Sequence, residues 1–316
     1  MTCASPQKDT IVFIPPGSVD WATVITQFIV TITALEGRLY ANWAGERLTR
    51  AIETACGAVA LAGDGQLRGI LLFELMDRVA ELSLPWVAPS RDSGEIARAL
   101  SAATVQAIRN EYPAITCLRA ERQLLPGQAD PGGLEAVGFH CAWRMRMTLQ
   151  LADWDGRVTL PAGYHLHPWD IRDLDQAAEV MYRANDGTLD AQLYAPFFGA
   201  SPAHCRKGLL AILAGKYGRV HTQASHVALA GHRLVGVNII VDEESALASV
   251  VEISVDPSVQ GQGIGRALLT QSLAVLRRER FECVELAVTK ANLPALRLYE
   301  SLDFQPAGDF PVCYWA

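Results

Sequence analysis

The sequence predicts an α/β fold, an α+β mixed and mostly antiparallel sheet flanked by helices, that occurs twice in tandem. Segments with the spacing of strands and of helices alternate along the chain, as they do in α/β and α+β proteins. The order of these segments in the second half recurs in the first half. Two matching positions lie at nearly equal offsets, 169 residues from Gly94 to Gly263 and 165 residues from Phe139 to Phe304. A repeat of this kind indicates a duplicated domain.

Length and composition agree with two folded domains. The chain has 316 residues, and about 150 residues per domain is usual. Half of the residues are apolar and 19% are charged, which excludes disordered and collagen-like chains. The segment 153–162, in a stretch rich in glycine, aspartate and proline, is the expected linker between a first domain, 1–152, and a second domain, 163–316.

Charge and cysteine content narrow the partners and the compartment. The net charge of −7 disfavours a nucleic-acid-binding protein, which would need a basic face. The seven cysteines lie far apart without a CxxC pair, so we expect free thiols in a reducing, cytoplasmic compartment. The apolar stretch Trp21–Leu35 is too short to span a bilayer and lacks the basic start of a signal peptide. We expect it to be a packed helix with Asp20 as its N-cap, and we expect no membrane partner.

The second half contains the clearer elements. A strand at 164–169 and helices at 170–183 and 203–214 are followed by strands at 225–230, 234–241 and 247–255. The first two of these three strands are joined by the turn Ala230–Arg233, which predicts a hairpin. A helix that opens at the glycines of 261–265 runs through Arg280, and a strand at 284–288 and a short helix at 294–302 complete the half.

The first half repeats this order more faintly. A hairpin is expected from strands at 58–62 and 67–75 around the turn Gly63-Asp64-Gly65. A strand at 81–87, a helix at 95–110 and a strand at 115–119 follow. The segment Leu134–Phe139 then corresponds to Tyr299–Phe304 of the second half.

The segment from Val251 to Arg266 carries the strongest chemical signal. A strand leads into a loop with Gly261, Gly263 and Gly265, and the loop opens directly onto a helix. Unpaired N–H groups and the helix dipole make such a loop a cradle for phosphate or pyrophosphate, although glycine runs also form ordinary turns. The loop lacks the lysine and hydroxyl of a Walker loop. It also lacks the glycine spacing and the following acidic residue of a Rossmann loop.

Two motifs resemble those of one family. The pattern Gln260-x-x-Gly263-x-Gly265 resembles the acyl-coenzyme A loop of the GCN5-related N-acetyltransferase (GNAT) family. Further along, Asn292-Leu-Pro-Ala295-Leu-Arg-Leu298-Tyr299-Glu-Ser-Leu302-Asp303-Phe304 is similar to the family's N-x-x-A-x-x-L-Y-x-x-x-G-F helix, with Asp303 where glycine is common. Two such halves in one chain resemble the tandem type of the family, similar to mycothiol synthase.

The resemblance implies a function and a set of binding residues. It implies transfer of an acetyl group from acetyl-coenzyme A (acetyl-CoA), as co-substrate, to a primary amine of a small molecule or peptide in the second domain. The N–H of Val255, in the strand before the loop, is then the candidate donor to the thioester carbonyl. The residues implied in binding acetyl-CoA are Ile253, Val255, Gln260, Gly261, Gln262, Gly263, Ile264, Gly265, Arg266 and Asn292. A non-catalytic acyl-CoA-binding or scaffolding protein is the alternative.

Two residues are candidates for proton transfer. Tyr299 matches the family's acid, whose hydroxyl can protonate the departing sulfur, although an aromatic core residue would fit the same position. Glu252 is the candidate general base for the amine. Many relatives instead place a glutamate at the position of Ser249, so other carboxylates stay open as bases: Asp186, Asp242 and Glu244.

Other polar and aromatic residues admit two interpretations each. Asn292 contacts the ligand or caps the last helix, and Arg266 contacts a phosphate or is solvated. His165 and His167 share a strand face without an evident third ligand, so no metal site is expected. Four residues either line the acceptor pocket or pack in the core: Tyr194, Pro196, Phe197 and Phe198.

The first half lacks the residues that the chemistry needs. Ile96 replaces the last glycine of its loop, and Leu134 stands where Tyr299 stands. We expect this half to be degenerate and not catalytic. Its expected role is to wall the acceptor cleft or to stabilise the active half.

Overall fold

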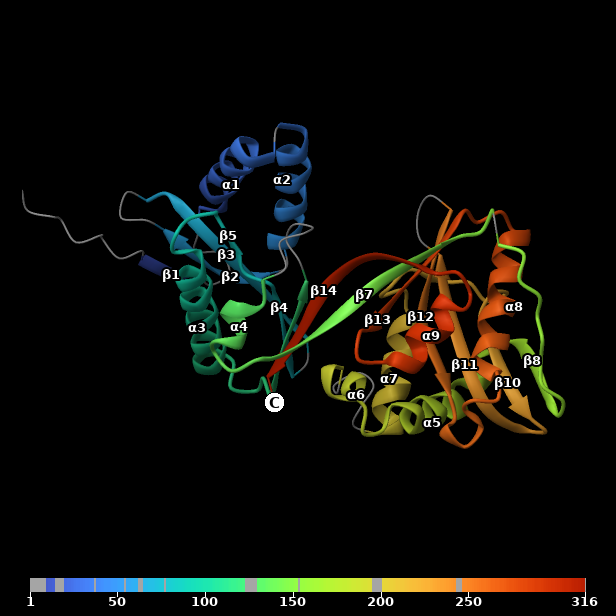
Figure 1. The fold of residues 1–316 in the computed structure, drawn as a ribbon. Coiled ribbons are helices and arrows are strands. Elements are labelled where there is room, and N and C mark those ends of the chain that lie inside the picture. Colours follow the sequence, from blue (N-terminus) through green and yellow to red (C-terminus); the bar gives the residue numbers. More distant parts are fainter. Residues whose placement is uncertain are drawn as a thin grey trace, which may run out of the picture. The chain divides into compact units, whose positions relative to one another are not determined.

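The computed structural model describes residues 10–14, 20–36, 38–53, 55–61, 65–76, 78–122, 130–152, 154–194, 201–242 and 246–315. The chain divides into two compact units (Figure 1). Unit 1 comprises Met1–Ala142 and Pro311–Ala316, and unit 2 comprises Trp143–Phe310. Each unit is a mixed sheet flanked by helices, as the sequence predicts.

Unit 1 is a sheet with helices on both faces. Its strands lie in the order β1 (Thr10–Ile14), β2 (Cys56–Leu61), β3 (Leu67–Met76), β4 (Val79–Ser83), β6 (Cys117–Arg122) and the end of β14 (Gln305–Trp315), with β5 (Trp86–Val87) paired to β3. The β4–β6 pair is parallel. Alternate residues of β2 and β3 point to opposite faces of the sheet and enter two cores. In one core, α1 (Trp21–Glu36) and α2 (Arg38–Ile52) pack against Val59, Ile70 and Leu72. In the other core, α3 (Ser93–Glu111) and α4 (Gly132–Glu135) pack against Ala58, Leu71 and Phe73.

Unit 2 repeats this plan. Its strands lie in the order β7 (His140–Gln150), β13 (Cys283–Thr289), β12 (Leu247–Val255), β11 (Arg233–Asp242), β10 (His226–Ala230) and β8 (Tyr164–Pro168), with β9 (Arg219–Val220) paired to β11. The β12–β13 pair is parallel. One core contains α5 (Leu174–Asn185) and α7 (Pro202–Leu213), and the cores of the other face contain α8 (Ile264–Arg278) and α9 (Leu293–Glu300). The short helix α6 (Leu189–Leu193) lies between α5 and α7 in sequence.

The last strand of each half pairs in the other unit. β7 follows α4 of unit 1, but its residues 144–150 pair with β13 in unit 2. β14 follows α9 of unit 2, but its residues Cys313–Trp315 pair with β6 in unit 1. The compact units therefore differ from a linear division at residues 153–162, and the described part of that expected linker lies inside unit 2.

The expected elements form with small shifts at their ends, and other elements are additional, among them β1, α2, β7 and β14. Asp20 caps α1 as expected, because its Oδ1 accepts from Thr23 N at 3.2 Å. The single strand expected at 81–87 is two strands, β4 and β5, separated by Leu84 and Pro85, since proline has no N–H for a ladder. The sequence did not predict β7 or β14.

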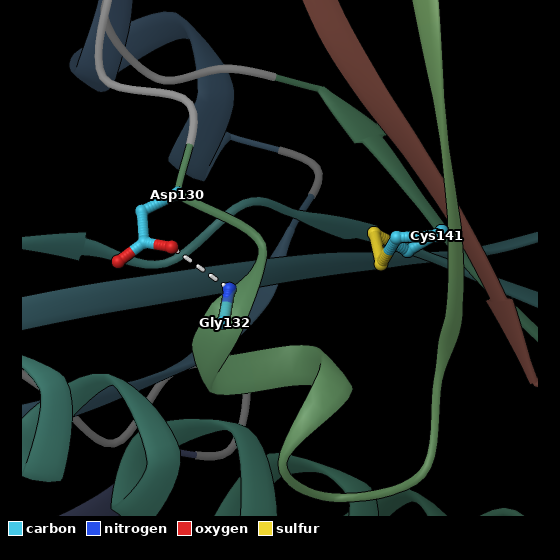
Figure 2. The surroundings of a disulfide bond; sticks show 4 residues. Asp130, Gly132 and Cys141 are labelled. Carbon is cyan, nitrogen blue, oxygen red and sulfur yellow. Dashed lines mark hydrogen bonds between the residues drawn. A yellow bond between two sulfur atoms is a disulfide. The ribbon is translucent and has the colours of Figure 1, made fainter.

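The cysteine expectation is wrong for one pair. Cys141 and Cys313 form a disulfide in unit 1, near the Asp130–Gly132 hydrogen bond at the start of α4 (Figure 2). The two cysteines are 172 residues apart, so their spacing along the chain could not reveal the pairing. Among the described residues, no helix is long and apolar enough to cross a bilayer.

Candidate functional site

The site begins where two parallel strands of unit 2 diverge. The pairing of β12 with β13 ends at Val250 and Leu286, although β12 continues to Val255. Asp256 N donates to Val235 O of β11 at 2.8 Å. Because neighbouring residues of an antiparallel pair face opposite edges, the N–H and C=O of Val255 point away from β11, toward the opening. The C=O accepts from Gln260 Nε2 at 3.0 Å.

The glycine loop has the backbone geometry that the expected anion cradle requires. Asp256 is buried and holds the turn after β12, because its Oδ1 accepts from Ser258 N at 3.0 Å and its Oδ2 accepts from Arg183 Nε at 3.0 Å. Gly261 and Gly263 have φ of +74° and +84°, a left-handed backbone that favours glycine. Gly263 is the N-cap of α8, so the first N–H groups of this helix lie beside the loop without acceptors inside the helix.

A cavity of about 740 Å³ joins the loop, the open edge of β12 and α9. Ten of the twelve residues proposed for the site line it: Ile253, Val255, Gln260, Gly261, Gly263, Ile264, Gly265, Arg266, Asn292 and Tyr299. Further lining residues come from the end of α5, the start of α6, β12, the end of β13 and α9. They include Asn185, Thr188, Asp190, Ser254, Thr289 and Arg297.

Two proposed residues are not in this lining. The Oε1 of Gln262 accepts from Tyr164 Oη at 2.8 Å, which engages the side chain with β8. Glu252 lies on the same face of β12 as Ser254, and its Oε1 accepts from Ser254 Oγ at 2.5 Å. Ser254 lines the cavity. The carboxylate is therefore one hydrogen bond from the lining.

Tyr299 is both a core residue and a lining residue. It is 6% exposed and its ring stacks edge-on with Phe304. Burial raises the pKa of the Tyr299 hydroxyl above its ordinary value, and the charge of Glu252 raises it further, while Arg144 opposes the shift. The hydroxyl therefore stays protonated at neutral pH and is available as a proton donor.

Glu252 has the electrostatics of a base. Burial raises the pKa of its carboxyl to about 7, the hydrogen bond from Ser254 opposes this shift, and the charge of Asp190 adds to it. A carboxylate whose pKa lies near neutrality can both accept and release a proton there.

Asp190, in the first turn of α6, is a site residue that sequence reasoning missed. Its Oδ1 accepts from Thr289 Oγ1, and its Oδ2 accepts from Asn292 Nδ2 at 3.4 Å. Asn292 is also the N-cap of α9, because its Oδ1 accepts from Ala295 N at 3.2 Å. Asp190 thus connects α6 to the β13–α9 junction. It belongs to no recognisable motif, and only the Thr188 N-cap before it marked the start of a helix.

The remaining candidates have other partners. Arg266 lines the cavity and donates to Ser301 O at 2.9 Å. Asp242 pairs with Arg219 at 2.6 Å, and Asp186 ends α5; neither is in the lining. Ser249 Oγ donates to Glu285 Oε1 at 3.3 Å. Four candidate residues lie outside the described residues: Pro196, Phe197, Phe198 and Glu244.

Aromatic and histidine candidates complete the list. Tyr194 ends α6, and its hydroxyl accepts from Arg144 of β7. His167 Nδ1 contacts Pro168 O at 2.7 Å. In the described part of the chain, no three His, Cys, Asp or Glu side chains are grouped as metal ligands would be.

Unit 1 has a related backbone with different residues. Ala88 N donates to Arg68 O at 2.8 Å, as Asp256 N does to Val235 O in unit 2. By this correspondence Pro85, which has no N–H, takes the place of Ile253. Ser93 Oγ accepts from Ser90 N at 2.8 Å at the start of α3. Leu134, which is fully buried, takes the place of Tyr299. Phe139 N donates to Leu134 O in unit 1, as Phe304 N donates to Tyr299 O in unit 2.

Comparison with known proteins agrees with this architecture. Residues 192–304 match the model of the acetyltransferase (GNAT) family. The mycothiol acetyltransferase of Thermomonospora curvata is 43% identical over 72 residues, which are 23% of this chain and 24% of that protein. The match thus spans about a quarter of that curated relative.

Solved structures resemble the whole chain. A GCN5-related N-acetyltransferase from Sphaerobacter thermophilus has a TM-score of 0.64 at 15% identity and covers 98% of this chain and 96% of its own. A tandem GNAT protein from the clavulanic acid biosynthesis pathway has a TM-score of 0.57 at 19% identity and covers 96% of this chain and 98% of its own. At such low identities the structural likeness shows the fold alone, and it confirms the predicted fold class. Residues 192–304 thus match the model of the acetyltransferase (GNAT) family, and the chain as a whole has the fold of solved GNAT and tandem GNAT structures.

Proposed function

We propose that the chain is an N-acetyltransferase that transfers an acetyl group from acetyl-CoA to a primary amine of a small molecule or peptide, with its active site in unit 2. The observation that carries the proposal is the cavity that combines the start of α8, the open edge of β12 and Tyr299. Acyl transfer from a nucleotide-bearing thioester needs an anion cradle, a donor to the carbonyl and an acid for the leaving group. The cavity contains a candidate for each.

The residues of the cavity fit acetyl-CoA, which supplies a pyrophosphate, an amide-bearing arm and a thioester. The N–H groups of Ile264, Gly265 and Arg266 would hold the pyrophosphate at the positive end of the α8 dipole. The open edge of β12 would pair with the arm. The N–H of Val255 would then donate to the thioester carbonyl, and one such donor is typically worth about 3 kcal/mol of barrier.

Two residues would move protons. Glu252, with a pKa of about 7, would accept the proton of the amine as its nitrogen attacks. Tyr299, whose pKa is raised by burial, would donate its proton to the sulfur as the carbon–sulfur bond breaks. Glu252 and Tyr299 lie in the same compact unit, which supports the proposal that they act together.

For unit 1 we propose a degenerate, non-catalytic role. Pro85 removes a backbone donor from the strand that corresponds to β12, and Leu134 removes the acid. Ser93, with its own hydrogen bonds, and Ile96 stand at the start of α3 in place of an open glycine loop.

Calorimetry and turnover assays on the full chain test the proposal. We expect saturable, one-site binding of acetyl-CoA, and release of free thiol when one member of a primary-amine panel is added. The panel includes an N-terminal alanyl peptide, glucosamine and spermidine. Binding without turnover across the panel would favour the alternative, a non-catalytic acyl-CoA-binding protein. Absence of binding would refute both.

A further inference from the structure

The proposed base and the cavity are separated by one side chain. Glu252 is not a lining residue, whereas Ser254, two residues further along β12, is. Ser254 Oγ donates to Glu252 Oε1 at 2.5 Å, a short contact of the kind that an ionised acceptor forms. A group in the cavity therefore meets the serine hydroxyl first and the carboxylate behind it.

The hydroxyl is held in the orientation that a relay needs. A serine hydroxyl has one donor and two acceptor lone pairs. The donor points to Glu252, and Asn185 Nδ2 approaches the same oxygen at 3.5 Å, while Asn185 is itself fixed by donation to Met181 O at 2.9 Å. One acceptor position of Ser254 Oγ is thus left for a donor in the cavity.

We propose that Ser254 is a catalytic residue that relays the amine proton to Glu252; this inference rests on the proposed acetyltransferase function. As the amine nitrogen forms its bond to the thioester carbon, its N–H bond breaks and the proton passes to Ser254 Oγ. The hydroxyl proton of Ser254 passes at the same time to Glu252 Oε1, so that the serine ends as it began. The carbon–sulfur bond breaks with the electron pair on sulfur, and Tyr299 supplies the proton there.

The groups around Glu252 are consistent with a relay. Asp190 on α6, Tyr299 on α9 and Cys205 on α7 are the titratable neighbours that interact with its charge. Burial and Asp190 both favour the protonated carboxyl, so Glu252 can retain the proton that the serine delivers. Ser254 is 4% exposed, so its hydroxyl lies in the wall of the cavity and not on the outer surface.

The test compares Ser254→Ala with Ser254→Thr, which keeps a hydroxyl. For the alanine variant we expect kcat/KM for the amine to fall about 100-fold at pH 7, as for loss of general base catalysis. The threonine variant should stay within a few-fold of wild type, and the Kd for acetyl-CoA should be unchanged in both. Carboxyl-labelled glutamate NMR on the ligand-free protein gives a second readout: the pKa of Glu252 should rise in the alanine variant, because the opposing hydrogen bond is lost.

A double-mutant cycle with Glu252→Gln separates a relay from independent roles. If the two residues act as one unit, the double variant is about as slow as the slower single variant. If the double variant instead loses the product of the two single-variant losses in kcat/KM, the relay is overturned while the proposed function stays intact. A kcat/KM of Ser254→Ala within threefold of wild type would have the same meaning. Absence of turnover by the wild-type chain with every amine of the panel would overturn both.

Discussion

Gly263→Ala is the change that most directly probes the proposed acetyl-CoA cradle. Gly263 has φ of +84° and is the N-cap of α8, and it lines the cavity. The nearest protein atom to an added Cβ is Pro161 Cγ at 3.9 Å, an ordinary van der Waals contact. The substitution therefore meets no steric obstacle in the protein, and its cost is in the backbone.

The size of that cost follows from the backbone conformation. An L-residue in the left-handed region costs about 1–2 kcal/mol. Alanine also restricts the unfolded chain more than glycine does, and this entropy effect offsets about 0.4–1 kcal/mol of the backbone cost. We expect a net loss of about 1 kcal/mol in the free energy of unfolding, which lowers Tm by about 2–4 °C for a unit of this size. Acetyl-CoA binding should weaken at least tenfold, about 1.4 kcal/mol, because in the proposed complex the added methyl group would stand where the pyrophosphate meets the backbone.

A matched control separates the two effects. Gly231, in the turn between β10 and β11, has φ of +61° and no protein atom within 4 Å of an added Cβ. Gly231→Ala should lower Tm similarly without changing the Kd for acetyl-CoA, measured by calorimetry on the full chain. Equal losses of affinity in both variants would mean that reduced stability is the cause. A Kd for Gly263→Ala within twofold of wild type would refute the cradle.

Further predictions concern the proton-transfer residues and the disulfide. Tyr299→Phe should lower kcat about 100-fold or more with little change in the Kd for acetyl-CoA, and full turnover at every pH would exclude the phenol as the acid. The pKa of the Glu252 carboxyl is about 7 in the folded protein, above its ordinary value of 4.5. The unfolded chain therefore releases this proton first, and the free energy of unfolding falls as pH rises from about 4.5 to 7. Glu252→Gln should therefore raise the free energy of unfolding at pH 8 by about 1–3 kcal/mol, but leave it unchanged near pH 4, in denaturant titrations. The kcat/KM of the wild-type chain should decrease as the pH falls below about 7, because Glu252 becomes protonated. A kcat/KM that does not change with pH would contradict the role of Glu252 as the base. Reduction of the Cys141–Cys313 disulfide to two thiols removes a cross-link that spans 172 residues. Dithiothreitol should therefore lower the stability of unit 1 by up to about 5 kcal/mol, whereas the double serine variant should not respond to it.

Local signals predicted the elements that build the site. The strand over 247–255 has the same bounds in the structure, and the helix after the glycines begins at Ile264. These elements were predictable because each carries its own signal in the sequence: several β-branched residues in the strand, a run of glycines in the loop and an apolar face on the helix. Asp303 illustrates a departure that the backbone explains. Its φ of +67° is the left-handed conformation for which glycine is common, and aspartate tolerates it better than most residues.

Features that depend on distant parts of the chain were not predictable from local patterns. β14 contains Pro306, Gly308 and Pro311, which are typical of a loop, and its pairing with β6 joins Tyr314 to Arg119 across the sequence. Asp190 became a site residue only because the fold brings it to Thr289 and Asn292. A five-residue helix carries too little periodicity to indicate which of its residues faces a cavity.

The exchange of final strands gives a physical reason for the chain to keep its first half, for which we propose no catalytic role. Residues 144–150 of β7, the last strand of the first half, pair with β13, the strand that ends at Thr289 in the lining of the cavity. Arg144 of that strand also donates to Tyr194 and to Ala287 O at 2.6 Å, and its charge acts on the pKa of Tyr299. Conversely, the last residues of the chain complete the sheet of unit 1. Loss of the first half would therefore leave β13 with an unpaired edge beside the proposed acid, so selection on the second site also preserves a strand of the first half.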